Sequence, residues 1–130
     1  MSDLSSSMAA SASGMAAQAA RLRVVSENIA NIDTPGFRSK TVSFQAVSEM
    51  FENSGTVKTG RVQLSNAELP QVFDPGHPLA DENGYYQGSN VDLMVEIADA
   101  REAQRSYEAN LKMFDQSRQM ASSILELLRR

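Results

Sequence analysis

Four potential metal ligands lie close together in the second half of the chain. They are one imidazole and three carboxylates: Asp74, His77, Asp81 and Glu82. Zinc and harder divalent ions use these ligand types in proteins. The spacing matches no metal motif, however, and the prolines among these residues indicate a loop held by its own backbone. We therefore expect a structural loop without a metal ion, and a small metal-dependent enzyme remains only as an alternative.

Other catalytic chemistry has even less support. The chain has no cysteine and a single histidine, and it contains neither a Gly-x-Ser-x-Gly elbow nor a glycine-rich phosphate loop. Its net charge of −4, without a basic patch, argues against nucleic-acid binding. We expect no catalytic residue, no cofactor and no enzymatic activity.

The elements that can bury surface lie at the two ends of the chain, on either side of a polar middle. Near the start, four apolar residues recur every seven positions: Met8, Met15, Leu22 and Ile29. This spacing predicts a helix over residues 1–33 with a stripe of coiled-coil type. Asp3 is the only charged residue among its first twenty. Because most side chains of this helix are small and it carries almost no charge, we expect it to become ordered only on assembly.

The end of the chain carries a longer stripe, in which apolar residues recur in steps of three and four. Its apolar members are Leu93, Ile97, Tyr107, Leu111, Phe114, Leu125 and Leu128. The pattern predicts a helix over residues 89–130, with Ser89 as N-cap and Asp92 completing a capping box. We assign both stripes to helix packing, within one subunit and between subunits. Gln104 and Arg118 on the second stripe suit a register-setting role.

The middle, residues 34–88, begins with the turn signal Thr34-Pro35-Gly36-Phe37. Pro35 disfavours helical geometry at the preceding residue. Gly36 can take the positive φ that the third position of a type II turn requires. The first helix should therefore end here, and the turn should fix the direction in which the chain leaves it.

Weak strand patterns follow this turn. Apolar and polar residues alternate over residues 42–46 and 62–64, which predicts one or two β-hairpins. Turn signals fall at three places, residues 53–55, 74–76 and 82–84. Residues 48–53 also fit a short helical turn, and residues 70–84 are expected to form an irregular loop.

The expected fold class is therefore mainly α. Long N- and C-terminal helices should pair as a coiled-coil-like bundle, with a small β-hairpin and irregular segments between them. Residues 1–33 and 89–130 would form one discontinuous helical domain, and residues 34–88 a separate turn, hairpin and loop region.

Two segments resemble the bacterial flagellar axial proteins, the family that builds the rod and hook. The first carries an Asn-Ile-Ala-Asn pattern followed by Thr-Pro-Gly and an aromatic residue, at Asn28, Asn31, Thr34, Pro35, Gly36 and Phe37. The second, residues 89–93 followed by 102–110, resembles the family's C-terminal helix. Both segments occur in the expected order and near the expected ends. The asparagine side chains are expected to bond backbone or a neighbouring subunit.

Within that family, the short length and residues 74–85 resemble a subunit of the proximal rod. Distal rod and hook relatives insert much larger β domains. The resemblance covers roughly residues 4–46 and 72–128, and it implies a structural subunit of the flagellar basal body. Such a subunit would polymerise through its terminal helices into a tubular drive shaft that transmits torque across the periplasm.

The resemblance also implies where the protein works and what it meets. The subunit would be exported through the flagellar type III export apparatus without a cleaved signal peptide and would work in the rod of the basal body. Its expected partners are copies of itself, proximal and distal rod proteins and the protein joining the rod to the inner-membrane ring. Nucleic-acid binding and membrane insertion are not expected. A helical-hairpin protein of another type III secretion apparatus is the remaining alternative.

Overall fold

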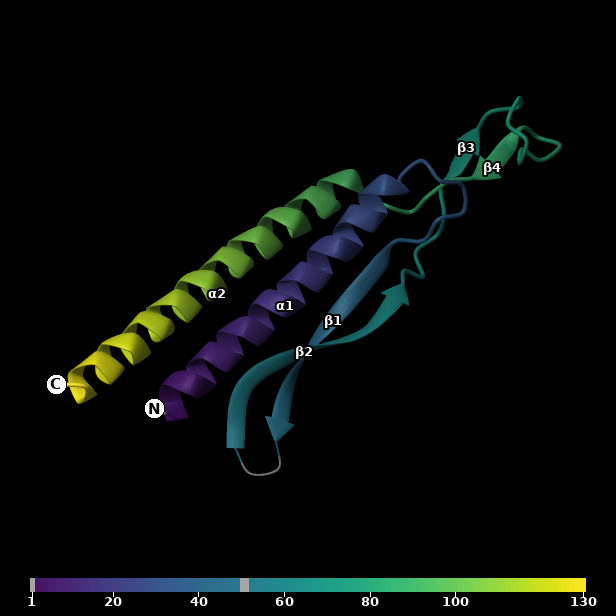
Figure 1. The fold of residues 1–130 in the computed structure, drawn as a ribbon. Coiled ribbons are helices and arrows are strands. Elements are labelled where there is room, and N and C mark those ends of the chain that lie inside the picture. The colour runs from purple at the N-terminus through teal and green to yellow at the C-terminus, as the bar shows by residue number, and fades with distance from the viewer. Residues whose placement is uncertain (1, 50–51) are drawn as a thin grey trace.

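Two long antiparallel helices form the body of the computed structural model, which describes residues 2–49 and 52–130 (Figure 1). Helix α1 spans Ser2–Ala30 and α2 spans Leu93–Leu128. The 36 residues of α2 give it a length of about 54 Å. Within the described residues, neither helix carries the apolar run needed to cross a membrane. The pairing confirms the predicted mainly α fold.

Helix α1 ends at the predicted turn. Beyond Ala30, the backbone N–H of Asn31 still reaches Glu27 O at 3.2 Å. Phe37 N then donates to Thr34 O at 3.2 Å, and Gly36 has a φ of 75°. These values confirm a type II turn with a proline and a glycine at its centre.

Helix α2 begins later than its sequence suggested. Its N-cap is Asp92, whose Oδ1 accepts a hydrogen bond from Met94 N at 3.0 Å. The prediction of Ser89 as N-cap is wrong, because Ser89 Oγ instead accepts from Val91 N at 3.1 Å and closes a small turn before the helix. Both side chains can satisfy backbone donors, and Asp92 is the one placed at the first turn.

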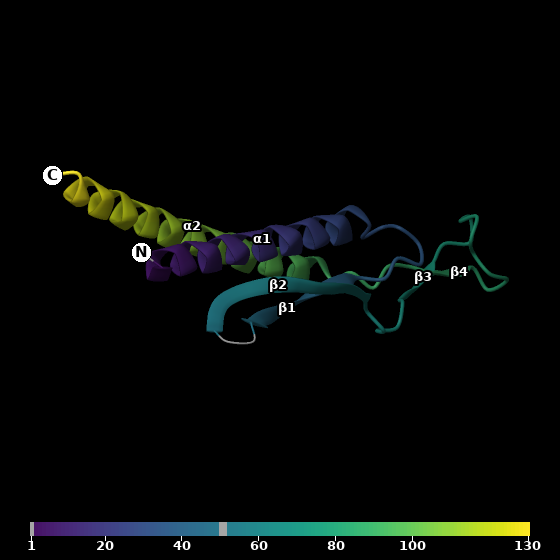
Figure 2. The ribbon, with the colours of Figure 1, turned by 60° about the horizontal axis from the view of Figure 1, so that its bottom comes forward.

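A long hairpin lies along α1 (Figure 2). Strand β1, Lys40–Glu49, pairs antiparallel with β2, Glu52–Leu64. The turn predicted at residues 53–55 is wrong, because Glu49 pairs with Glu52 and places these residues in β2. Gly55, with a φ of 68°, instead lies where the register shifts, and such a bulge uses the conformational freedom of glycine.

The alternative of a helical turn over residues 48–53 is also wrong for the part that the structure describes. Residues 48–49 and 52–53 pair as strands, and residues 50–51 lie outside the described residues. The predicted alternation holds on β1, where Val42 and Phe44 are half-buried and their neighbours are exposed.

A second, shorter hairpin projects beyond the helices, at the end opposite the two termini (Figure 1). Strand β3, Gln71–Phe73, pairs antiparallel with β4, Tyr85–Gln87. The expected irregular loop over residues 70–84 therefore begins later, because its first part is a strand. The turn signals at residues 74–76 and 82–84 are confirmed, and Gly84 has a φ of 85°. We call residues 71–87 the tip.

The core is thin. Among the described residues, the buried apolar side chains are Ala17, Val24, Val25 and Ala103. They lie between the helices or between α1 and the long hairpin, and larger apolar side chains remain exposed over much of α2. The subunit therefore leaves much of its apolar surface uncovered.

Candidate assembly junction

The two sequence segments that flank the helices meet at one place, which we call the junction. Gly36 N donates to Gln87 O at 3.1 Å, and Asn90 N donates to Phe37 O at 3.2 Å. The Asn90 side chain adds a bond, since its Oδ1 accepts from Ser39 N at 2.6 Å. The exit from α1 and the entry into α2 are therefore bonded side by side.

Asn28 is the most completely buried large side chain of the junction, with 1% of its surface exposed. Its amide bonds both backbone groups of Lys40, because Oδ1 accepts from Lys40 N at 2.9 Å and Nδ2 donates to Lys40 O at 2.8 Å. Nδ2 also donates to Glu96 Oε1 at 3.0 Å. One side chain thus joins α1, β1 and α2. An ion pair between Lys40 and Glu27 lies beside it.

Glu96 is the buried carboxylate of this group, with 5% of its surface exposed. Burial raises its pKa above the ordinary value of 4.5, and the nearby charges of Asp99 and Asp92 act in the same direction. Hydrogen bonds from Asn28 and Ser39 lower the pKa without cancelling the effect of burial. The junction therefore holds a carboxyl group that gives up its proton less readily than an exposed glutamate does.

Asn31 and Thr34 stabilise the turn itself. Asn31 Nδ2 donates to Glu27 O at 2.8 Å, and Thr34 Oγ1 donates to Asn31 Oδ1 at 3.1 Å. These bonds are local, whereas Asn28 connects segments far apart in the sequence. Of the two asparagines of the motif, Asn31 therefore stabilises the turn locally and Asn28 connects different elements.

Two rows of small or polar residues, one on each helix, form the seam between α1 and α2, and in each row the residues recur every seven positions. They are Ser7, Gly14, Arg21 and Asn28 on α1, and Glu96, Ala103, Asn110 and Ser117 on α2. The hydroxyl oxygens of Ser7 and Ser117 lie 3.1 Å apart. A Cβ at Gly14 would lie 2.8 Å from Asn110 Oδ1, so the Asn110 side chain packs directly against the glycine there. Arg21 donates to two carboxylates of α2, at 3.1 and 3.3 Å.

The apolar stripes predicted from the sequence lie beside this seam. On α1, Met8, Met15, Leu22 and Ile29 are half-buried. On α2, Ile97 and Phe114 are half-buried, while the other five members are exposed: Leu93, Tyr107, Leu111, Leu125 and Leu128. Their assignment to contacts between subunits stays a prediction.

The sequence prediction missed Glu96, Ser39 and Lys40 as members of the junction. Glu96 reads as an ordinary helix carboxylate, and the other two lie in a weak strand pattern. A signal was present in the spacing, because small or polar residues recur at every seventh position on both helices. Apolar periodicity drew attention to the neighbouring positions instead.

Two of the four potential metal ligands of the tip, His77 and Asp81, bond its backbone. His77 Nδ1 accepts from Leu79 N at 3.1 Å, and its ring stacks on Tyr86 at 4.0 Å between centroids. Asp81 Oδ1 accepts from the backbone N–H groups of Asn83 and Tyr85, both at 2.9 Å. No group of three or more candidate ligands is gathered among the described residues.

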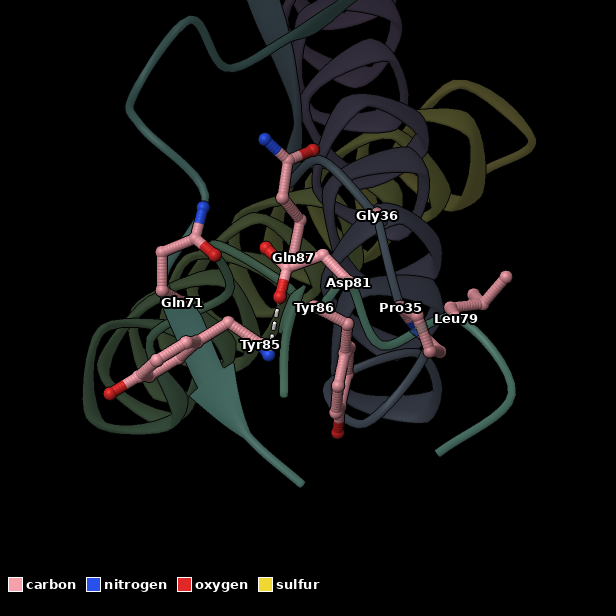
Figure 3. A pocket seen from close by; sticks show the side chains of 8 residues that line it. All are labelled: Pro35, Gly36, Gln71, Leu79, Asp81, Tyr85, Tyr86 and Gln87. Carbon is pink, nitrogen blue, oxygen red and sulfur yellow. Dashed lines mark hydrogen bonds between the residues drawn. The ribbon is translucent and has the colours of Figure 1, made fainter. Parts of the chain in front are cut away.

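An open cleft of about 410 Å³ lies between the turn after α1 and the tip (Figure 3). Its lining residues are Pro35, Gly36, Gln71, Leu79, Asp81, Tyr85, Tyr86 and Gln87. In Figure 3 the ring of Tyr86 lies between Tyr85 and the side of the cleft formed by Pro35 and Leu79. The lining of the cleft is more polar than apolar, because two tyrosines, two glutamines and one carboxylate outnumber the apolar side chains of Pro35 and Leu79.

The chain is similar to known proteins over nearly its whole length. A model described as flagella basal body rod protein matches residues 8–38, and one described as flagellar basal body rod FlgEFG protein C-terminal matches residues 82–127. The flagellar basal-body rod protein FlgC of Agrobacterium fabrum is 40% identical, over 99% of this chain and 98% of the relative.

Two further relatives come from distant bacteria. The flagellar basal-body rod protein FlgC of Salmonella typhimurium is 37% identical, over 88% of this chain and 90% of its own. That of Bacillus subtilis is 34% identical, over 93% and 95%. Between them, the two family matches include both segments that meet at the junction.

Proposed function

Because the chain belongs to the family of flagellar basal-body rod proteins that includes FlgC, we propose that it is a subunit of the proximal rod. It is a structural protein of the flagellar basal body and serves motility. The proposal adds a position within the rod, a mode of polymerisation and a route to the site of assembly.

One observation carries the proposed polymerisation. The seam inside the subunit is small and polar, while large apolar side chains of α2 remain exposed beside it. Leu111 is 41% exposed and Leu125 is 51% exposed, although both lie on a continuous helical stripe. Burial of such a stripe by a neighbour gains roughly 25 cal/mol for each Å² of apolar surface removed from water.

The contacts between subunits would be heterologous, with different surfaces of each subunit touching. Contacts of this kind build an open helical array when the rotation between subunits does not close a ring. Long helices packed side by side near the axis would stiffen the resulting tube. We propose that this stiffness lets the rod transmit torque across the periplasm.

The proposed partners follow from the same position. They are copies of this chain, other proximal and distal rod proteins and the protein at the boundary between rod and inner-membrane ring. The flagellar type III export apparatus would deliver the subunit without cleavage of a signal peptide. We propose no catalytic step and no cofactor, because assembly alone accounts for the role.

The test is substitution of Leu111 with aspartate in a strain that lacks the chromosomal gene. A charge on the exposed stripe should prevent packing between subunits while leaving the fold intact, since Leu111 is only partly covered in the subunit. We expect loss of swimming and, by electron microscopy of basal bodies, an inner-membrane ring without a completed rod.

Gln119→Asp is the matched control, because it places the same charge on an exposed polar position of α2 outside the stripe. It should restore swimming. Normal swimming of the Leu111→Asp strain would overturn the packing role. Rods of normal length in the deletion strain itself would overturn the proposed place in the rod.

A further inference from the structure

The tip is held to the rest of the subunit by few contacts. Strands β3 and β4 pair with each other, and within the described residues neither of them packs on a helix or on the long hairpin. In Figure 1 the tip projects beyond the helices. Two segments, residues 65–70 and 88–92, connect it to the body of the subunit, and together we call them the neck. The direction of the tip therefore depends on what fixes the neck.

Arg38 bonds the first neck segment from the exit of α1. Its Nη1 donates to Ser65 O and to Ala67 O, both at 3.1 Å. The side chain is half-buried, and in the part of the chain that the structure describes it forms no ion pair. A charged donor bonds a carbonyl more strongly than a neutral donor does. One side chain next to the turn after α1 thus holds two backbone groups of the neck.

Asn90 bonds the same place from the second neck segment. Its Nδ2 donates to Ala67 O at 3.1 Å, so this carbonyl accepts from Arg38 and Asn90 together. Its Oδ1 accepts from Ser39 N at 2.6 Å, and its backbone N–H donates to Phe37 O at 3.2 Å. Asn90 therefore joins both neck segments to the chain that leaves α1. We call the side chains of Arg38 and Asn90 the clamp.

The clamp is continuous with the seam between the helices. Ser39, whose N–H bonds Asn90, also donates from Oγ to Glu96 Oε1 at 3.3 Å. Glu96 in turn accepts from Asn28 at 3.0 Å. Hydrogen bonds therefore connect the neck to the paired helices as well as to the turn.

The two neck segments are attached in different ways. Gly36 N donates to Gln87 O at 3.1 Å, so a backbone bond holds the chain where the second segment begins. In the first segment, the described hydrogen bonds that join residues 66–69 to the body come from two side chains, Arg38 and Asn90. Loss of these bonds would leave the tip attached firmly along one segment, about which it could turn.

We propose that Arg38 and Asn90 are positioning residues, whose side chains clamp the neck and set the direction of the tip relative to the helix pair. A tip with one fixed direction presents its exposed side chains at the same place in every subunit. Phe73 and Leu79, which are 62% and 65% exposed, are two of them. The clamp acts within the subunit, and only its effect on motility rests on the proposed function in the rod.

Distances between spin labels test the clamp, because the natural chain has no cysteine. Labels on Ser26→Cys and Asn83→Cys measure the tip against α1, and labels on Ser26→Cys and Gln119→Cys measure the helix pair; all three positions are exposed. The full chain is measured by pulsed electron paramagnetic resonance, at an osmolyte concentration at which the helix pair gives one narrow distance distribution. We expect a narrow tip distribution that becomes about twofold broader in Arg38→Met and in Asn90→Ala, with the helix-pair distribution unchanged.

Arg23→Met and Asn66→Ala are the matched controls. Each removes the same type of side chain at an exposed position, and Asn66 lies in the neck beside Ala67. Neither should change the tip distribution. Arg38→Lys should keep most of its narrowness, since an ammonium group can donate to both carbonyls. This rescue separates bonding of the neck from a general packing role of the arginine.

A tip distribution that stays narrow in both clamp variants overturns the proposal, because other contacts then hold the tip. A broad tip distribution in the natural background, beside a narrow helix-pair distribution, overturns it as well. So does broadening of both distributions together in the variants, because Arg38 and Asn90 would then support the whole junction and not the tip in particular.

Swimming is scored separately, in the strain that lacks the chromosomal gene. Arg38→Met should reduce the diameter of the swimming ring in soft agar several-fold, and Arg38→Lys should restore most of it. Normal swimming of a variant whose tip distances are broadened would overturn the importance of the tip's direction for the rod. The clamp and the proposed function would then both stand.

Discussion

The two ends of the helix pair differ in how fully a single subunit buries their side chains. At the junction, Asn28 is 1% exposed and its amide bonds both backbone groups of Lys40 as well as Glu96. At the opposite end, Leu128 is 75% exposed and lies beyond the start of α1. The junction fixes geometry within the subunit, whereas the last residues of α2 keep apolar side chains that the subunit itself leaves exposed.

The same contrast exists across α2 itself. The side facing α1 is lined by Ala103, Asn110 and Ser117, which let the helices approach closely and bond. The large apolar side chains lie beside that side and remain partly exposed. Specific polar contacts therefore define the subunit, and in the proposed rod the larger hydrophobic gain would come from assembly.

The largest effect on the free energy of unfolding is expected for Asn28→Ala. The change leaves two backbone groups of Lys40 without their side-chain partner and leaves Glu96 Oε1 with only the bond from Ser39, and should cost about 3 kcal/mol. Urea unfolding followed by circular dichroism measures it, in an osmolyte-containing buffer that favours folded helices. Asn31→Ala, which removes only local bonds, should cost about 1 kcal/mol. Equal losses would contradict the special role of Asn28.

Gly14→Leu should produce the next largest loss. A Cβ at this position would meet Asn110 Oδ1 at 2.8 Å, so a leucine must displace the Asn110 side chain or push the helices apart, at a cost of about 2 kcal/mol. Ala12→Leu adds the same side chain at an exposed position of α1 and should change the free energy by less than about 0.5 kcal/mol. The same unfolding assay compares them. A seam that tolerates Gly14→Leu as well as Ala12→Leu would not be closely packed.

A smaller effect, and one that depends on pH, is expected for Glu96→Gln. Because the pKa of Glu96 is raised in the folded state, folding favours its protonated form, and the stability that it contributes is largest at low pH. That contribution falls as pH rises through the ordinary value of 4.5 and then through the raised pKa. The natural chain should therefore lose stability relative to the glutamine variant between pH 4 and pH 8.

Unfolding of both proteins across this pH range gives the difference directly. Glu108→Gln, at an exposed position of α2, is the control and should show a nearly constant difference from the natural chain. A constant difference for Glu96→Gln as well would mean that burial at the junction does not disfavour the carboxylate.

The sequence was sufficient for the two helices and for the turn after α1, and insufficient for the strand bounds and for the faces that pack. Periodicity located both helices, and Pro35 with Gly36 located the turn, because these signals are local. The seam depends on how closely the backbones approach, which Gly14 and Ala103 permit and apolar periodicity does not report. Asn28 and Glu96 are 68 residues apart, so no local pattern connects them. That α1 becomes ordered only on assembly stays a prediction.

The smallest effect on the isolated subunit is expected for Leu125→Ser, at the far end from the junction. Leu125 is 51% exposed, so its loss should change the free energy of unfolding by less than about 0.5 kcal/mol. Val25→Ala, which removes a side chain only 4% exposed, should cost about 1 kcal/mol or more in the same assay. In the deletion strain, however, Leu125→Ser should abolish swimming. Loss of motility without loss of stability separates surface kept for neighbours from surface that holds the subunit together, and a large loss of stability would show that Leu125 belongs to the subunit's own fold.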